Sequence, residues 1–411
     1  MDFKDFDFKE ELLNGIEAIG FKTATPIQEK AIPLILEGRD IIGSAQTGTG
    51  KTAAFLLPII NKIISSKSDE HIKALIIVPT RELAIQIDQH MEGLSYFTSV
   101  SSIAVFGGGD GASFSREKQA LSTGVDVVVG TPGRLIAHLN LGYVKIDMLE
   151  YLVLDEADRM LDMGFNDDIM KILSYLPKKR QNLLFSATMP PKIRDLAKKT
   201  LQNPEEINIA ISKPAERVVQ AAFVVHETQK IPLVKYLLSA KRVKSALVFC
   251  STKKSAKELS QELKRSALSV EDIHSDLDQS ERQKILLNFR NRELKALIAT
   301  DILSRGIDIE DIDLVVNFDV PKEGEDYIHR IGRTARAAAQ GFAFTLINER
   351  DQRSFQRIEH LLGKPVTKAK IPEFLGEGPE YNPMATKPQD GRGGFKKRGG
   401  KKNFTKNRKK D

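Results

Sequence analysis

Two sets of short, continuously apolar segments alternate with helical stretches, and they constrain the fold of this chain more than any other feature. Segments such as Ala74–Pro79, Val125–Gly130 and Tyr151–Asp155 lack the polar alternation of strands that face solvent. Continuously apolar strands are typical of a parallel sheet covered by helices on both faces. The rhythm returns in the second half of the chain, so the sequence predicts an α/β protein with two such domains.

The boundaries follow from the same pattern. In the first set we also expect strands at Asp40–Ser44, Ser102–Phe106 and Asn182–Ser186, and helices at Arg81–Met91 and Gly133–Leu139. In the second set we expect strands at Ala246–Cys250 and Lys295–Thr300, and helices at Lys253–Ser266 and Ser280–Arg290. The predicted organisation is a first domain over 1–205, a proline-containing linker over 206–216, a second domain over 217–365 and a disordered basic tail over 366–411.

Composition excludes several classes of protein. No apolar run approaches the ~20 residues that span a bilayer, so we expect no membrane association. The opening MDFKDFDFKE lacks the apolar core of a signal peptide, which predicts a cytoplasmic protein. Cys250 is the one cysteine of the chain, so neither an intramolecular disulfide nor a cysteine-cluster metal site can form.

Positive charge is concentrated at the end of the chain. The net charge is +7, and the eleven Lys or Arg and two Asp of Lys387–Asp411 contribute +9, which leaves −2 for residues 1–386. Gly, Phe395 and Phe404 are interleaved with these basic residues. Such a tail indicates a polyanionic partner, nucleic acid first and an acidic membrane second, although a tail that only aids solubility would look the same.

The segment Ala45–Thr52 (AQTGTGKT) follows a predicted strand and precedes a predicted helix. Its glycines let backbone N–H groups surround a phosphate, and the helix N-terminus adds positive charge. Lys51 would then reach the terminal phosphates, and the Thr52 hydroxyl would hold Mg²⁺. A glycine-rich turn without a ligand is the alternative. The nucleotide-binding residues predicted here are Ala45, Gln46, Thr47, Gly48, Thr49, Gly50, Lys51 and Thr52.

A second acidic element ends the apolar strand at Tyr151, in the run YLVLDEAD. The carboxyl ends of strands are where α/β sheets bind ligands. Asp155 is suited to Mg²⁺, largely through water, and Glu156 to orienting or deprotonating an attacking water. The alternative is an ordinary acidic helix start, since acids are favoured there in any case.

With these two elements the chain resembles the DEAD-box RNA helicases of superfamily 2, whose name stands at Asp155–Asp158. The resemblance runs from about Phe3 to about Leu362. It implies two RecA-like domains, each a mostly parallel sheet with helices on both faces. Within the family, Asp158–Phe165 and Lys179–Ser186 look most like the bacterial RhlE-type subgroup.

Gly20–Gln28 resembles the family's Q motif, in which Gln28 would read the adenine edge and Phe21 would stack on its ring. An amide both donates to and accepts from adenine, which gives this assignment a chemical basis. Ala24 stands where the family usually has proline. The alternative interpretation, without the family resemblance, is that Gln28 is an ordinary amide on a helix surface.

Other segments resemble the RNA-facing motifs. The residues concerned are Pro79, Thr80, Arg81, Gly108, Thr131, Pro132, Gly133 and Arg134 in the first domain, and Gln279, Arg282 and Thr300 in the second. Backbone N–H groups and hydroxyls at such strand–helix junctions suit phosphate and ribose. Ser186 and Thr188 resemble the motif that couples ATP hydrolysis to strand separation, and their hydroxyls would bond the DEAD acids or cap a helix.

The segment Tyr327–Arg336 resembles motif VI. Arg333 and Arg336 lie three residues apart and would share a helix face, as arginine fingers on the γ-phosphoryl group. A basic, solvated helix face is the alternative. The family resemblance also assigns Asp308 to the ATP side of the cleft.

The resemblance therefore implies an RNA-dependent ATPase that uses ATP and Mg²⁺ and locally unwinds short RNA duplexes or remodels RNA–protein complexes, with low sequence specificity. It suggests a monomer that acts in ribosome assembly or RNA turnover, on ribosomal precursor particles or beside RNA-decay proteins. An RNA clamp that unwinds little, a DNA-directed helicase and a non-enzymatic nucleic-acid-binding protein are the alternatives.

Overall fold

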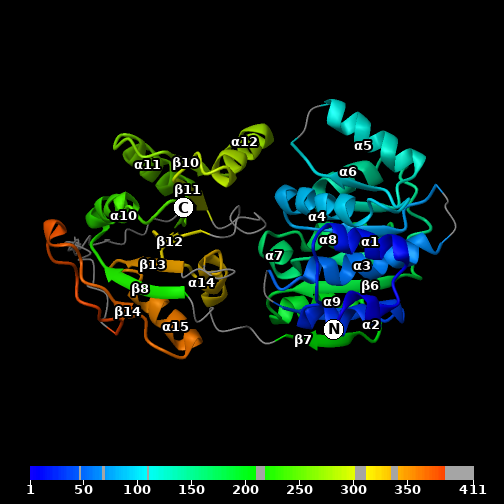
Figure 1. The fold of residues 1–411 in the computed structure, drawn as a ribbon, viewed down its shortest axis with the longest axis horizontal. Helices are drawn as coiled ribbons and strands as arrows, with labels where there is room; N and C mark the ends of the chain where they lie inside the picture. Colours follow the sequence, from blue (N-terminus) through cyan, green and yellow to red (C-terminus); the bar gives the residue numbers. More distant parts are fainter. Residues whose placement is uncertain are drawn as a thin grey trace, which may run out of the picture.

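The computed structural model describes residues 1–45, 48–66, 70–108, 111–209, 218–300, 312–334 and 341–384. These residues form two α/β domains that lie side by side along the long axis of the molecule (Figure 1). Each domain contains a seven-stranded sheet whose neighbouring strands all run parallel. The predicted fold class is confirmed.

The sheet of the N-terminal domain has the order β3-β4-β2-β5-β6-β1-β7. Its strands are β1 Ile41–Ser44, β2 Ala74–Ile77, β3 Ser102–Val105, β4 Val127–Gly130, β5 Tyr151–Leu154, β6 Gln181–Ser186 and β7 Glu205–Asn208. Its helices are η1 Phe3–Phe6, α1 Glu10–Ala18, α2 Pro26–Leu36, α3 Lys51–Ile64, α4 Arg81–Leu94, α5 Gly111–Thr123, α6 Pro132–Leu139, α7 Ala157–Asp162, α8 Asn166–Leu173 and α9 Pro191–Thr200.

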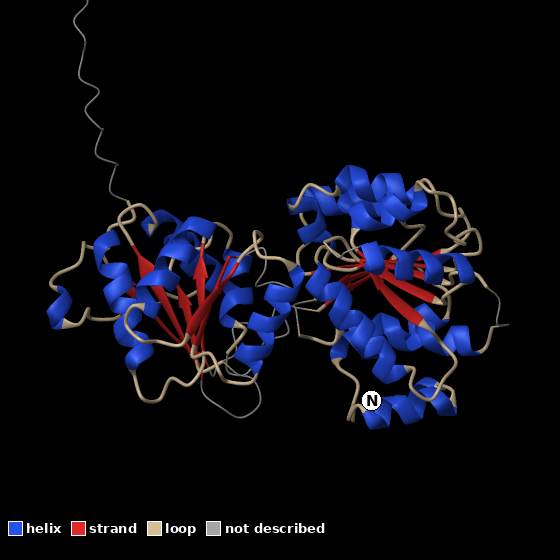
Figure 2. Ribbon diagram, turned by 90° about the horizontal axis from the view of Figure 1, so that it is seen from above, coloured by secondary structure: helices blue, strands red, loops and turns tan. Residues whose placement is uncertain are grey.

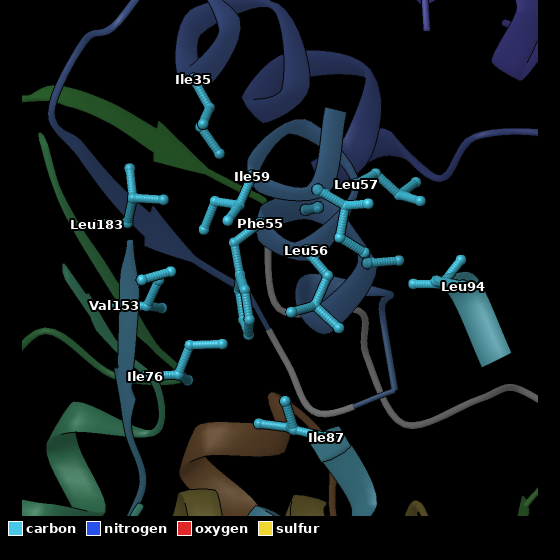
Figure 3. Close-up of a cluster of buried hydrophobic side chains, with 14 of the residues drawn as sticks. Ile35, Phe55, Leu56, Leu57, Ile59, Ile76, Ile87, Leu94, Val153 and Leu183 are labelled. Carbon is cyan, nitrogen blue, oxygen red and sulfur yellow. The ribbon is translucent and has the colours of Figure 1, made fainter. Parts of the chain in front are cut away.

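Successive strand residues enter two separate cores, one on each face of this sheet. Ile76 and Val153 face the core built with α1 to α4, whereas Leu75 and Leu152 face the core built with α6 to α9. Figure 3 shows Ile76 and Val153 directed toward Phe55 of α3. Burial on both faces explains why these strands read as continuously apolar.

The C-terminal domain repeats this architecture with the order β10-β11-β9-β12-β13-β8-β14. Its strands are β8 Val218–Val224, β9 Ala246–Cys250, β10 Val270–Ile273, β11 Ala296–Thr300, β12 Leu314–Asn317, β13 Gly341–Ile347 and β14 Thr367–Lys368. Its helices are η2 Glu227–Gln229, α10 Lys230–Ser239, α11 Lys253–Lys264, α12 Gln279–Arg290, α14 Gly324–Ile331, α15 Gln352–Leu362 and η3 Glu373–Leu375. In both domains, helices lie on both sides of the sheet (Figure 2).

One expected boundary falls inside a strand. Residues from 206 onward were assigned to a linker, but β7 (Glu205–Asn208) pairs in parallel with β1 and adds an edge strand to the first sheet. Ile207 is its buried residue, and its neighbours are charged or polar. Because β7 contains a single apolar residue, its sequence lacks the continuous apolar run that marks the other strands, and it resembles a linker.

The expected start of disorder at residue 366 is wrong for residues 366–384. Strand β14 pairs with β8, and three groups converge on the Glu359 carboxylate of α15. The Val366 N–H donates to it at 2.8 Å, Lys368 Nζ at 2.6 Å and the Tyr381 hydroxyl at 2.7 Å. The C-terminal domain therefore continues to Met384, and the rest of the expected tail, 385–411, lies outside the described residues.

Among the described helices, not one combines the length and the apolar character needed to cross a bilayer. Most of the predicted motifs that the structure describes lie in loops and helix starts that follow strands, whereas Gly20–Gln28 follows α1 and Arg333 follows α14. Because all strands of each sheet are parallel, these loops gather at one edge of their sheet.

Candidate nucleotide and RNA site

A cavity of about 650 Å³ lies at the carboxyl end of β1, beside the glycine-rich loop. Its wall contains the predicted residues Phe21, Gln28, Gly48, Gly50, Lys51, Thr52, Asp155 and Glu156 of the N-terminal domain, together with Arg333 of the C-terminal domain. Four separate segments of the chain thus contribute these residues to one hollow. The cavity spans both domains, so neither domain forms it alone.

The glycine-rich loop leads directly into α3. Gly50 has φ of 91°, a left-handed conformation that favours glycine, and the helix begins at Lys51. Lys51 is 7 % exposed, and its Nζ donates to the Ala45 carbonyl at 2.6 Å. The ammonium group is thereby held against the loop, at the N-terminus of the helix, where phosphate oxygens are favoured.

Gln28 ties the predicted adenine site to the phosphate loop. Its Nε2 donates to the Gly50 carbonyl at 3.1 Å, and its Oε1 accepts from the Thr25 N–H at 2.9 Å. A side chain at Gly50 would place its Cβ 2.5 Å from Gln28 Nε2, so the close approach requires glycine. One amide proton and one carbonyl lone pair of Gln28 remain for a ligand.

Phe21 forms the other side of this region. It is 36 % exposed and stacks on Phe3 with ring centroids 6.1 Å apart. An exposed aromatic face at the rim of a cavity offers a platform for a flat ring.

The two acids after β5 differ in their electrostatic environment. Burial raises the pKa of Asp155 to about 7, although the positive charge of Lys51 counteracts this. Burial by itself also raises the pKa of Glu156. Positive charge on Arg159 and Lys51, and then on Arg333, outweighs burial and holds this pKa below its ordinary value. Glu156 therefore stays ionised, and a cation placed beside Asp155 would favour the ionised form of that carboxyl as well.

Glu156 also has an unusual backbone. Its φ and ψ of 51° and 48° are left-handed, which is uncommon for a residue other than glycine. Its Oε2 accepts from Arg159 Nη1 at 3.1 Å, and Arg159 is 4 % exposed. Strain of this kind persists where surrounding contacts fix it, often at functional sites.

Thr188 bonds the fourth DEAD residue, as its hydroxyl chemistry suggested. Asp158 Oδ2 accepts from the Ala187 N–H at 3.1 Å, the Thr188 N–H at 2.9 Å and the Thr188 hydroxyl at 3.0 Å. Ser186 instead donates from its hydroxyl to the Thr188 carbonyl at 2.7 Å. The loop after β6 is thereby fastened to the loop after β5.

Arg81 occupies the first turn of α4 and rests on Gly108. A Cβ on Gly108 would overlap Arg81 Nη1, and its φ of +86° independently favours glycine. Burial, and then the positive charges of Arg282 and Arg134, lower the pKa of Arg81. The guanidinium groups of Arg282 and Arg134 thus both act on Arg81, although Glu82 partly offsets them, and their positive charge favours an anion beside Arg81.

The other predicted RNA-side residues take the expected places at helix starts. Thr80 caps α4, its hydroxyl accepting from the Leu83 N–H at 3.4 Å, and Pro79 precedes it. Thr131 caps α6, Pro132 begins it, and Gly133 is exposed. Because the first N–H groups of a helix lack acceptors within the helix, these helix N-termini favour an anion at the edge of the sheet.

On the C-terminal side, Thr300 is the last residue of β11, and Gln279 and Arg282 lie in the first turn of α12. Arg282 donates from Nη1 to Glu82 Oε1 at 3.2 Å and from Nη2 to the Ser275 carbonyl at 3.1 Å. Both amide atoms of Gln279 are buried with no hydrogen-bond partner within the described part of the chain. Arg282 therefore bridges the domains, a contact that the sequence did not predict.

The comparisons with known proteins agree with this geometry. Residues 25–196 match the model of the DEAD/DEAH box helicase family, and residues 229–338 match that of the helicase conserved C-terminal domain. The ATP-dependent RNA helicase CshA of Listeria monocytogenes is 44% identical over 373 residues, which cover 90% of this chain and 71% of that protein.

The chain belongs to the DEAD-box family of ATP-dependent RNA helicases. The DEAD-box helicase RhpA of Helicobacter pylori is 41% identical over 371 residues, or 90% of this chain and 74% of the relative. This DEAD-box protein is thus an RNA-dependent ATPase that uses ATP and Mg²⁺ and binds RNA.

Solved DEAD-box structures match the arrangement of both domains. Saccharomyces cerevisiae Dbp5 bound to RNA and ADP BeF3 gives a TM-score of 0.81 at 31% identity, covering 90% of this chain and 95% of that one. Mss116p bound to ssRNA and AMP-PNP gives 0.79 at 30% identity, covering 91% and 80%.

Several site residues of this DEAD-box helicase were not predicted. Gln86 and His90 of α4 line the cavity, Arg159 pairs with Glu156, and Glu117 pairs with Arg134. Gln86 and His90 are four residues apart, so the sequence could have placed them on one face of a helix. The two ion pairs depend on contacts in the folded protein, which residue spacing does not predict. The predicted residues Gln46, Thr47, Asp308 and Arg336 lie outside the described residues.

Proposed function

We propose that this helicase hydrolyses ATP in the cavity between its domains, with Lys51, Asp155 and Glu156 on one side and Arg333 on the other. The observation that carries the proposal is their common position in one cavity of about 650 Å³. ATP then draws the domains together, because its binding energy depends on both. RNA that touches both domains favours the same state, so the two ligands bind cooperatively.

The base is adenine in this proposal. Gln28 offers one donor and one acceptor to the adenine edge, a combination that guanine does not complement. Phe21 covers the ring. The bond from Gln28 to the Gly50 carbonyl supports a further role, since base recognition would be transmitted to the phosphate loop.

The phosphates are held by the loop Ala45–Thr52, with Lys51 close to the terminal phosphates. Among described residues, no cluster of three or more His, Cys, Asp or Glu side chains could hold a metal by itself. This fits Mg²⁺, which usually takes one or two protein ligands and completes its shell with phosphate and water. Asp155 and the Thr52 hydroxyl would supply those ligands, and Mg²⁺ would neutralise charge on the phosphates.

Glu156 orients or deprotonates the attacking water, and its lowered pKa keeps it ionised, as either role requires. Arg159 holds the Glu156 carboxylate in place. Arg333 stabilises negative charge on the transferred phosphoryl group, and we assign the same role to Arg336. Asp308 is assigned to the ATP side of the cleft on the family resemblance.

RNA lies across the guanidinium groups of Arg81, Arg134 and Arg282 and the helix starts at Thr80 and Thr131. Gly108, Gln279 and Thr300 complete this surface. Such contacts favour phosphates and 2′-hydroxyls, so sequence specificity in the core is low. The bonds between Asp158 and Thr188 would couple the nucleotide site to this surface.

The biological output is local unwinding of short duplexes or remodelling of RNA–protein complexes, by a monomer in the cytoplasm. We propose a role in ribosome assembly or RNA turnover, and the RhlE-type subgroup stays a prediction. A clamp that holds RNA without separating strands is the second candidate, because it needs the same site.

The experiment measures phosphate release from ATP with RNA, with DNA and without nucleic acid, beside displacement of a short RNA duplex. We expect RNA to stimulate hydrolysis more than DNA, and Lys51→Ala to abolish it. Stimulation without strand displacement would favour the clamp. Equal stimulation by DNA, or no hydrolysis with RNA, would contradict the proposal.

A further inference from the structure

Helix α5 buries a carboxylate where an apolar residue would be expected. Glu117 and Leu121 are the buried residues of this thirteen-residue helix, and Glu117 is 6 % exposed. Removing a carboxylate from water costs several kcal/mol unless charged or hydrogen-bonding partners compensate. The burial of Glu117 is therefore explained by its charged and hydrogen-bonding partners and not by apolar packing.

Both partners of Glu117 come from α6, and both meet the same oxygen. Arg134 donates from Nε to Glu117 Oε2 at 2.6 Å, and His138 Nε2 lies 2.7 Å from that oxygen. Arg134 and His138 are four residues apart and so share one face of α6. On its far side, His138 Nδ1 contacts the hydroxyl of Tyr143.

A second residue of α5 fixes the plane of the same guanidinium group. Phe114 lies three residues before Glu117, on the same face of the helix. The Arg134 guanidinium carbon is 4.5 Å from the centroid of the Phe114 ring, and this ring stacks on His138 at 4.4 Å. The Glu117 carboxylate binds one edge of the Arg134 guanidinium group and the Phe114 ring covers its face. Together they leave this group little freedom to rotate.

One donor of this fixed group remains available. Arg134 Nη2 is buried and has no hydrogen-bond partner among the residues that the structure describes. A buried donor without a partner is unfavourable, so Nη2 is expected to gain a partner in another state. The positive charge of Arg134 already acts on Arg81, and two guanidinium groups together favour an anionic acceptor.

We propose that Glu117 is a positioning residue for RNA binding: through Oε2 it holds the Arg134 guanidinium so that Nη2 meets a phosphate of the RNA. This inference rests on the RNA-binding role proposed for Arg134. Glu117 does not touch RNA itself. Helix α5 accordingly serves to fix α6, on whose outer side it lies in Figure 1.

The test uses the full-length protein and four variants: Arg134→Ala, Glu117→Ala, Glu117→Gln and the double variant with both alanines. Gln119→Ala, an exposed position on the same helix, is the matched control. Affinity for a short single-stranded RNA is measured by fluorescence anisotropy over a range of salt concentrations. RNA-independent ATP hydrolysis and the thermal unfolding midpoint report separately on the fold.

We expect Arg134→Ala to weaken RNA binding about tenfold and to reduce the salt slope by about one phosphate contact. Glu117→Ala reproduces both changes, and the double variant is no weaker than Arg134→Ala. Glu117→Gln stays within about twofold of wild type, since an amide oxygen can accept both bonds that Oε2 accepts. Gln119→Ala has wild-type affinity.

Four results would overturn the inference. If Glu117→Ala binds RNA like wild type while Arg134→Ala binds it weakly, Glu117 does not position Arg134. The same conclusion follows from additive losses in the double variant, or from a Glu117→Gln variant as weak as Glu117→Ala. Arg134→Ala with unchanged RNA affinity would instead refute the proposed role of Arg134, and the inference with it.

Discussion

Arg282 of the C-terminal domain donates from Nη1 to Oε1 of Glu82 in the N-terminal domain at 3.2 Å. The two side chains are 9% and 7% exposed, so this ion pair is removed from water. Removing one partner of a buried ion pair leaves the other charge buried without a partner, which carries a substantial free-energy penalty. The pair therefore links the positions of α12 and α4, one on each side of the proposed RNA surface.

The first prediction concerns this interdomain pair. We expect Arg282→Ala or Glu82→Ala to lower RNA-stimulated ATP hydrolysis about tenfold, because an unpaired charge disfavours the arrangement in which the domains meet. The exchange Glu82→Arg with Arg282→Glu should recover much of the loss. Steady-state hydrolysis over a range of RNA concentrations measures this, and an exchange variant no better than the single variants would argue against the link.

The second prediction concerns Gly108 and its neighbour Gly107. Gly108→Ala should weaken RNA binding about tenfold, because its Cβ would displace the Arg81 guanidinium and its φ of +86° disfavours alanine. Gly107→Ala should have a much smaller effect, since its Cβ would meet Arg81 Nη2 at 3.8 Å, an ordinary contact. RNA affinity of both variants is the measurement, and equal losses would show that Arg81 is not the reason.

The third prediction concerns Asp158 and Thr188. Asp158→Ala removes the acceptor of the three hydrogen bonds from the loop after β6, whereas Thr188→Val removes one of them and keeps the two backbone bonds. At about 1 kcal/mol for each bond, Asp158→Ala should be the more severe variant. We expect strand displacement to fall more than ATP hydrolysis in both. Parallel loss of the two activities would argue against a coupling role.

The fourth prediction separates two parts of the C-terminal region. Deleting 387–411 should weaken RNA binding and flatten its salt dependence, because eleven Lys or Arg are lost, while RNA-independent ATP hydrolysis survives. Deleting 366–411 should also destabilise the C-terminal domain, since β14 and the Lys368 and Tyr381 bonds to Glu359 are removed.

Thermal unfolding and RNA titration at low salt distinguish the two deletions. We expect the longer deletion to lower the unfolding midpoint by about 5 °C or more and the shorter one to leave it unchanged. Equal RNA affinity with and without 387–411 at low salt would refute the role of the tail.

Much of the fold could be predicted because buried parallel strands and their following loops leave local signals. Asp155 and Lys51 stand directly after apolar strands or glycines, so their clustering followed from the topology. Strand β7 escaped prediction because Ile207 is its single apolar anchor and its pairing with β1 joins distant segments. The bond that Lys368 of β14 makes likewise depends on Glu359, which nothing in the local sequence marks.

The roles of charged residues were harder to predict than the strands. Arg282 matched an RNA-binding motif, yet its guanidinium bonds Glu82, 200 residues away in the chain. Glu117 and Arg159 read as ordinary helix-surface charges, and only their buried partners distinguish them. Periodicity reports burial of apolar faces, whereas the pairing of buried charges is set by tertiary contacts.

The account depends on a nucleotide held by both domains, and Arg333→Ala tests this most directly. ADP affinity and RNA-stimulated kcat would be measured for this variant and for the exposed control Arg357→Ala. We predict kcat at least about 10³-fold lower for Arg333→Ala, with ADP affinity within about threefold of wild type and an unaffected control. Near-wild-type RNA-stimulated hydrolysis by Arg333→Ala would contradict the shared site.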